Sequence, residues 1–148
     1  VSDCGWDMHA DASSAPAMTA MGPLGGQVDH AVSAFLDDVE ERGLSDRILL
    51  IITGEMGRSP KINGSGGRDH YGNMTSLCFA GGGLNMGQVI GRSDKTASVP
   101  ASTPISSSDV LATIMQTLFD PGELRLFSGV PKEIEQIITT GEPIRELI

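Results

Sequence analysis

The chain has 148 residues, a formal net charge of -9, and 19 glycines, and its composition is 39% hydrophobic and 20% charged. This length fits one domain, or the C-terminal portion of a larger one, and the composition is that of a folded protein with many tight turns. The acidic charge opposes binding to nucleic acid, and no apolar stretch approaches the roughly 20 residues that span a membrane.

The first predicted helix follows a predicted loop. Residues 10 to 27 combine Ala, Ser, Pro, Met and Gly without a clear period, which indicates a loop. From Val28 onward, apolar residues recur at helical spacing opposite an acidic face, and Gly43 supplies a stop. The sequence therefore predicts an amphipathic helix from Val28 to Gly43.

The middle of the chain alternates strand-like runs with glycine-rich loops. Residues 47 to 53 form a branched apolar run that predicts a strand, and residues 57 to 73 form a polar loop. Residues 76 to 80 and 88 to 90 predict two further short strands. Cys78 lies in the second strand-like run and is expected to be a buried thiol, while its distance in sequence from Cys4 excludes a paired zinc or redox motif.

The C-terminal third predicts helices. Residues 106 to 109, Ser-Ser-Ser-Asp, offer N-cap candidates for a helix that ends at Pro121 and Gly122, and a short helix is expected from Lys132 to Ile138. Helices alternating with apolar strands favour an α/β fold with a mostly parallel sheet covered on both faces.

Metal-competent side chains stand beside glycine in three separate segments. Asp7 and His9 are two positions apart and would point the same way on an extended segment, with Asp11 as a spare carboxylate. Glu55 follows the strand at 47 to 53, at the sheet edge where functional groups collect, and His70 lies in the polar loop. Imidazole nitrogens and carboxylate oxygens suit a borderline divalent cation.

Each of these residues also has a plain structural interpretation. Asp7 could cap a turn with His9 on the surface, and Glu55 could be a metal ligand, a general base, a residue that orients a ligand, or a solvated loop carboxylate. Arg58 and Arg68 suit bidentate binding of an anion but could equally pair with the abundant acids. His30 falls within the helical pattern and is expected to be structural.

Several motifs together carry a family likeness. The chain resembles a sulfatase-like bacterial family, catalogued as a domain of unknown function in the alkaline phosphatase superfamily, in residues 5 to 9, 53 to 60, 67 to 71, 80 to 83, 87 to 91 and 141 to 147. The resemblance implies a three-layer α/β sandwich with metal ligands on loops at the carboxyl edge of a mostly parallel sheet. It also implies hydrolysis of a sulfate or phosphate ester, and an exported or periplasmic location.

By motif order, the resemblance makes Asp7 and His9 the first ligand pair, Glu55 the acidic ligand after the next strand, and His70 the late histidine ligand. Asp11 and Asp69 would support the ligands, and Arg58 and Arg68 would bind the substrate. Zinc or manganese is favoured as the metal, with calcium as an alternative. Many superfamily members carry Asp-His-Gly where this chain has Glu55-Met56-Gly57, which argues against a second metal because hard ions bind a thioether poorly.

The expected function is that of the C-terminal part of a metal-dependent sulfate or phosphate ester hydrolase. Its nucleophile would lie upstream of Val1, in a missing N-terminal half, so the chain alone should be inactive. The expected substrate is an anionic small-molecule ester or a sulfated or phosphorylated glycan. The alternatives are a non-catalytic, metal-stabilised or ligand-binding module, and a structural domain without metal.

Overall fold

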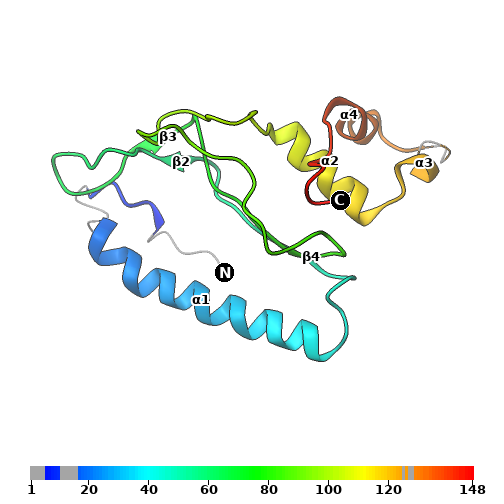
Figure 1. Ribbon diagram of the computed structural model, residues 1–148, viewed down its shortest axis with the longest axis horizontal. Helices are drawn as coiled ribbons and strands as arrows, with labels where there is room; N and C mark the ends of the chain where they lie inside the picture. Colours follow the sequence, from blue (N-terminus) through cyan, green and yellow to red (C-terminus); the bar gives the residue numbers. More distant parts are fainter. Residues whose placement is uncertain (1–5, 11–16, 125, 127–128) are drawn as a thin grey trace. The chain divides into compact units, whose positions relative to one another are not determined.

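The computed structural model describes residues 6–10, 17–124, 126 and 129–148, and the chain divides into two compact units (Figure 1). The first unit comprises Val1–Leu44, Ile52–Cys78 and Ser93–Pro100. The second comprises Ser45–Ile51, Phe79–Arg92 and Ala101–Ile148. Across the described residues there are four helices and four short strands, and none of these helices is long and apolar enough to cross a bilayer.

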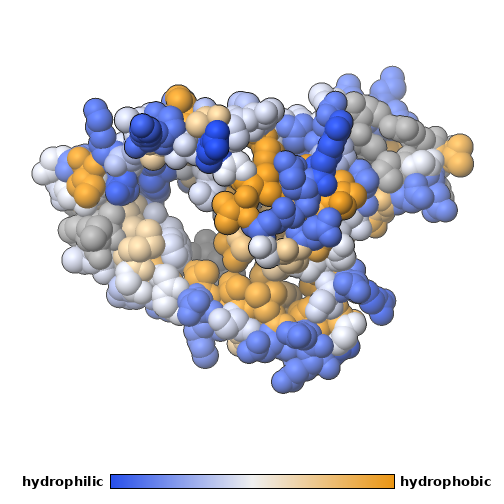
Figure 2. All heavy atoms as spheres, in the orientation of Figure 1, coloured by the Kyte–Doolittle hydropathy of each residue, from blue (hydrophilic) through white to orange (hydrophobic). Residues whose placement is uncertain are grey.

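Helix α1, Ala17–Glu41, is the longest element of the first unit. The expected loop was wrong for residues 17 to 27, because the helix begins before Pro23 and runs through it. The apolar spacing of the predicted helix continues backward through Leu24 to Met21, so the amphipathic stripe outweighs the poor helix propensity of proline and glycine. Hydrophobic and hydrophilic side chains lie on different sides of α1 (Figure 2).

The predicted stop at Gly43 is confirmed. Gly43 has a φ of +64°, its N–H donates to the Glu40 carbonyl at 2.9 Å, and the Leu44 N–H donates to the Val39 carbonyl at 2.9 Å. These are the two hydrogen bonds of a Schellman motif, which favours glycine at the left-handed position. Val39, in the last turn of the helix, is buried.

Strands β2, Gly57–Arg58, and β3, His70–Tyr71, form a short antiparallel ladder in the first unit. Its register pairs Arg58 with His70 and Gly57 with Tyr71. Residues directly opposite each other across a ladder have neighbouring backbones, so the ladder holds both ends of the 59–69 loop together. Two of the predicted site residues thereby become neighbours.

Strands β1, Leu49–Ile52, and β4, Cys78–Gly81, form the other two-stranded sheet. β1 lies within the predicted strand at 47 to 53, and β4 overlaps the one predicted at 76 to 80 but extends to Gly81. Residues 88 to 90 form no strand, and Val89 is 95% exposed. The expected burial of Cys78 was also wrong, since β4 exposes its first residue. A three-layer sandwich around a mostly parallel sheet stays a prediction.

Helices α2, Ser107–Leu118, α3, Pro121–Leu124, and α4, Lys132–Thr140, belong to the second unit. The predicted cap of α2 is confirmed: Ser106 and Asp109 form a capping box in which each side chain bonds the other residue's backbone N–H. Asp109 Oδ1 also accepts a hydrogen bond from the Glu142 N–H at 2.9 Å. The helix start is thus tied to the C-terminal segment.

Thr113 is the polar anchor of this unit and is fully buried. Its hydroxyl donates to the Asp109 carbonyl at 2.7 Å and accepts from the Ile144 N–H at 2.9 Å. Because a buried N–H without a partner is costly, this hydroxyl fixes where the C-terminal segment packs on α2.

We expect Thr113→Val to lower the free energy of unfolding by about 1 to 3 kcal/mol, because the Ile144 N–H loses its acceptor while the side-chain volume is kept. Urea denaturation of the purified chain measures this. Thr117→Val is the control, since the Thr117 hydroxyl only adds a donor to the Thr113 carbonyl. Equal losses in the two variants would contradict the assignment.

Candidate metal site

The site is built from a short segment near the N-terminus, the β2–β3 ladder and the 59–69 loop of the first unit. The Arg68 N–H donates to the Met8 carbonyl at 2.9 Å, and Gly67 lies so close to the His9 backbone that a side chain there would collide with it. Met8 is 4% exposed, whereas Asp7 is exposed and His9 half-buried. The side chains of Asp7 and His9, on either side of the buried Met8, face one common point.

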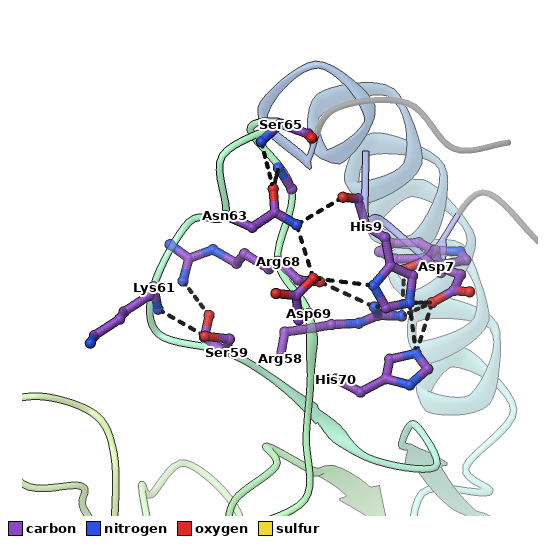
Figure 3. A network of polar contacts seen from close by, with 12 residues as sticks. Asp7, His9, Arg58, Ser59, Lys61, Asn63, Ser65, Arg68, Asp69 and His70 are labelled. Atoms are coloured by element: carbon purple, nitrogen blue, oxygen red, sulfur yellow. Dashed lines mark hydrogen bonds and ion pairs between the residues drawn. The ribbon is translucent and has the colours of Figure 1, made fainter. Parts of the chain in front are cut away.

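Three ligand-type atoms converge at that point (Figure 3). Asp7 Oδ1 lies 2.9 Å from His9 Nε2 and 3.0 Å from His70 Nε2, and the two Nε2 atoms are 3.0 Å apart. His70 reaches the group from β3, and the β2–β3 ladder determines where that strand lies. Residues more than 60 positions apart thus supply one triangle of donors.

Hydrogen bonds among the carboxylate oxygen and the two Nε2 atoms cannot satisfy all three atoms when the imidazoles are neutral. A neutral imidazole carries one N–H, so protons on both Nε2 atoms would oppose each other, while a proton on only one leaves the other nitrogen's lone pair facing a carboxylate lone pair. A cation between the three atoms would satisfy all of them at once. Ligands about 2.0 to 2.1 Å from a tetrahedral zinc ion are about 3.3 Å apart, so the triangle would need to widen only slightly.

A guanidinium group already contacts two corners of the triangle. Arg58 Nη2 lies 2.5 Å from Asp7 Oδ1, and Arg58 Nη1 lies 3.4 Å from His9 Nε2. The hydrogen bond from Arg58, followed by that from His70, lowers the pKa of Asp7 from 3.8 to about 2. The Asp7 carboxylate is therefore anionic at any physiological pH.

A second layer of polar contacts lies behind His9. Asp69 Oδ1 is 3.6 Å from His9 Nδ1, an ion-pair distance that is too long for a hydrogen bond. Asn63 Nδ2 donates to the same oxygen at 2.9 Å and is the main cause of a lowered pKa of Asp69. A carboxylate facing the outer nitrogen of a histidine is the arrangement that orients ligand histidines in metal proteins.

The predicted site residues fall into three groups. Asp7, His9 and His70 converge, with Arg58 and Asp69 in contact with them. Glu55, on the exposed turn between β1 and β2, is not part of this three-atom group, and Arg68 uses its Nη1 on the Ser59 and Pro60 carbonyls, at 2.8 and 2.9 Å. Asp11 lies outside the described residues.

Sequence reasoning missed Asn63. Its Oδ1 accepts the Ser65 and Gly67 N–H groups, both at 3.0 Å, which closes the glycine-rich turn below the site. The available signal was the pattern Asn63-Gly64-Ser65-Gly66-Gly67, since asparagine followed by glycine favours a turn that its own side chain closes.

We expect Arg58→Gln to raise the pKa of Asp7 from about 2 toward 3.8, because the strongest hydrogen bond to the carboxylate loses its charge. A carboxyl NMR titration measures the change. Arg42→Gln, which removes a guanidinium from an exposed pair with Asp38 in α1, is the control and should leave the titration of Asp7 unchanged.

The same lowered pKa predicts how stability depends on pH. A group whose pKa is lower in the folded chain contributes stability above its unfolded pKa and loses that contribution as pH falls through the folded value. The Asp7 contribution should therefore be complete above about pH 4 and decline toward pH 2. Between pH 6 and 2, the free energy of unfolding should decrease less steeply with falling pH in Arg58→Gln than in the wild-type chain. An equally steep decrease would contradict the role of the Arg58–Asp7 pair.

A family model described as "Protein of unknown function (DUF1501)" matches residues 1–148. No curated protein and no solved structure matches the chain significantly. The match covers every residue of the site, and its description gives no activity. By this full-length match, the chain belongs to the DUF1501 family of proteins of unknown function.

Proposed function

We propose that this chain supplies the metal-binding part of a metal-dependent hydrolase of sulfate or phosphate esters. Asp7, His9 and His70 would hold one divalent ion. The observation that carries the proposal is the convergence of Asp7 Oδ1 and the two Nε2 atoms within 3.0 Å of one another. The order of the motifs, which resembles that of sulfatase-like proteins, supports the reaction class.

The donor set favours zinc or manganese over calcium. Two imidazole nitrogens and one carboxylate oxygen match the ligands of borderline divalent ions, whereas calcium prefers 6 to 8 oxygens. Three ligands on partly exposed side chains also leave room for a further ligand, such as water or an ester oxygen. A divalent ion there would polarise an ester oxygen and stabilise negative charge on the attacking or leaving oxygen.

Arg58 is the residue suited to hold the anionic group of the ester. Its guanidinium contacts Asp7 and His9, and an ion bound to those residues would compete for the same carboxylate oxygen. Released from Asp7, the guanidinium would remain beside the ion, with a planar pair of N–H groups that fits sulfate or phosphate oxygens. Arg68 supports the loop through backbone carbonyls and is the weaker candidate.

A non-catalytic, metal-stabilised or ligand-binding module is the second candidate. Two observations favour it: Met56 offers a thioether where many superfamily members have histidine, and Arg58 forms an ion pair with Asp7 that offsets the charge of the carboxylate. Such a chain would bind an ion and gain stability without turning over an ester.

We expect one zinc or manganese ion to bind per chain, with the affinity falling by at least about 100-fold in His9→Ala, His70→Ala and Asp7→Asn. Calorimetry on chelator-treated protein measures the affinity. Zinc at 100 times its dissociation constant should also stabilise the fold by about 2.7 kcal/mol. His30→Ala, at an exposed position on α1, is the matched control. Zinc binding unchanged in His70→Ala would refute the site.

Turnover distinguishes the two candidates. We expect the natural protein that contains this chain to hydrolyse members of a panel of aryl sulfates and aryl phosphates, with activity lost on chelation and reduced by at least about 100-fold in His70→Ala. His30→Ala should retain full activity. Stoichiometric metal with no turnover of any ester would favour the module.

A further inference from the structure

We infer that Asn63 is a positioning residue that orients His9 for metal binding through Asp69. The inference rests on the proposed metal site and adds a residue that touches neither the ion nor the substrate. It follows from how the Asn63 amide is used in the described structure.

The side chain of Asn63 uses its full hydrogen-bonding capacity. Its oxygen accepts the Ser65 and Gly67 N–H groups, and its nitrogen donates to the His9 carbonyl at 3.0 Å and to Asp69 Oδ1 at 2.9 Å. Two lone pairs and two hydrogens are all that a carboxamide offers. Exchanging its oxygen and nitrogen would set donors against donors and acceptors against acceptors, so one orientation is fixed.

The two halves of this amide have separate targets. The oxygen closes the 63–67 turn, and the nitrogen reaches the backbone of His9 and the carboxylate behind its ring (Figure 3). If Asn63 only shaped the loop, the oxygen would suffice. The nitrogen therefore links the loop to the orientation of one proposed ligand.

Asp69, which Asn63 holds in place, acts on the imidazole of His9. Each nitrogen of His9 faces a carboxylate, Asp7 at 2.9 Å from Nε2 and Asp69 at 3.6 Å from Nδ1. Nε2 can bind an ion only when its lone pair is free, which places the proton on Nδ1, where the negative charge of Asp69 attracts it from 3.6 Å. Fixing Asp69 beside Nδ1 thus favours the tautomer that binds metal.

Asn63→Asp separates the two roles. The new carboxylate keeps an acceptor for the Ser65 and Gly67 N–H groups but loses both donors and repels Asp69. Asp69→Asn removes the charge behind His9 and keeps an oxygen that the Asn63 nitrogen can bond. Asn73→Asp is the matched control, because the Asn73 amide donates to the Tyr71 hydroxyl at 3.0 Å.

Two measurements test the inference. In metal-free protein at a pH where the imidazole is neutral, long-range ¹⁵N NMR should show a smaller fraction of the Nδ1–H tautomer of His9 in Asn63→Asp and Asp69→Asn, and no change in Asn73→Asp. Calorimetry should show zinc affinity lowered about 10 to 100-fold in the first two variants. The double variant should lose less than the product of the two single losses, because part of the effect of Asn63 on His9 passes through Asp69.

The results that would overturn the inference are distinct from those that would overturn the metal site. An unchanged tautomer fraction with zinc affinity within twofold of wild type in Asn63→Asp would refute it, and so would losses that multiply in the double variant. Failure of the wild-type chain to bind zinc would refute the metal site, while the metal-free tautomer would still decide the role of Asn63. If Asn63→Asp did not fold, an unchanged His9 tautomer in Asp69→Asn would refute the relay.

Discussion

The hydrogen bond from the Arg68 N–H to the Met8 carbonyl is the constraint on which the site depends. It joins two segments about 60 residues apart, and Gly67 permits the close approach because any side chain there would strike the His9 backbone. Closing so long a loop costs conformational entropy, so the contact must be supported by others. Burial of Met8 and the bond from Asn63 to the His9 carbonyl supply that support.

Charge balance explains why this cluster is stable in an acidic chain and still suited to a cation. The carboxylates of Asp7 and Asp69 and the guanidinium of Arg58 leave one net negative charge when both imidazoles are neutral. A divalent ion would turn that into one net positive charge, which suits an anionic ester. Arg58 offsets the charge of Asp7, and the same guanidinium would be available to an anion once an ion took its place at Asp7.

The sequence predicts most strongly where function depends on residue type and spacing. The Asp7–Met8–His9 spacing indicated a shared target, and the start of α2 could be narrowed to residues 106 to 109 because a helix cap is a local feature. Helix α1 was underestimated because Pro23 and its neighbouring glycines masked an apolar stripe that runs on to Met21. The role of Asn63 could not be predicted, because its donors reach partners brought near only by folding.

The openness of the cluster bears on the choice between catalysis and a structural metal. Structural zinc sites close the ion within four protein ligands, whereas catalytic sites leave a position for water or substrate. Here three ligand atoms converge, and the side chains of Asp7 and His70 are 56% and 45% exposed. Among the described residues, Glu55 is not part of this group, and the exposure of Asp7 and His70 would give water or an ester oxygen access to an ion held there. An ion bound there would meet an incoming anion directly, and for this reason we favour hydrolysis over the stabilising module.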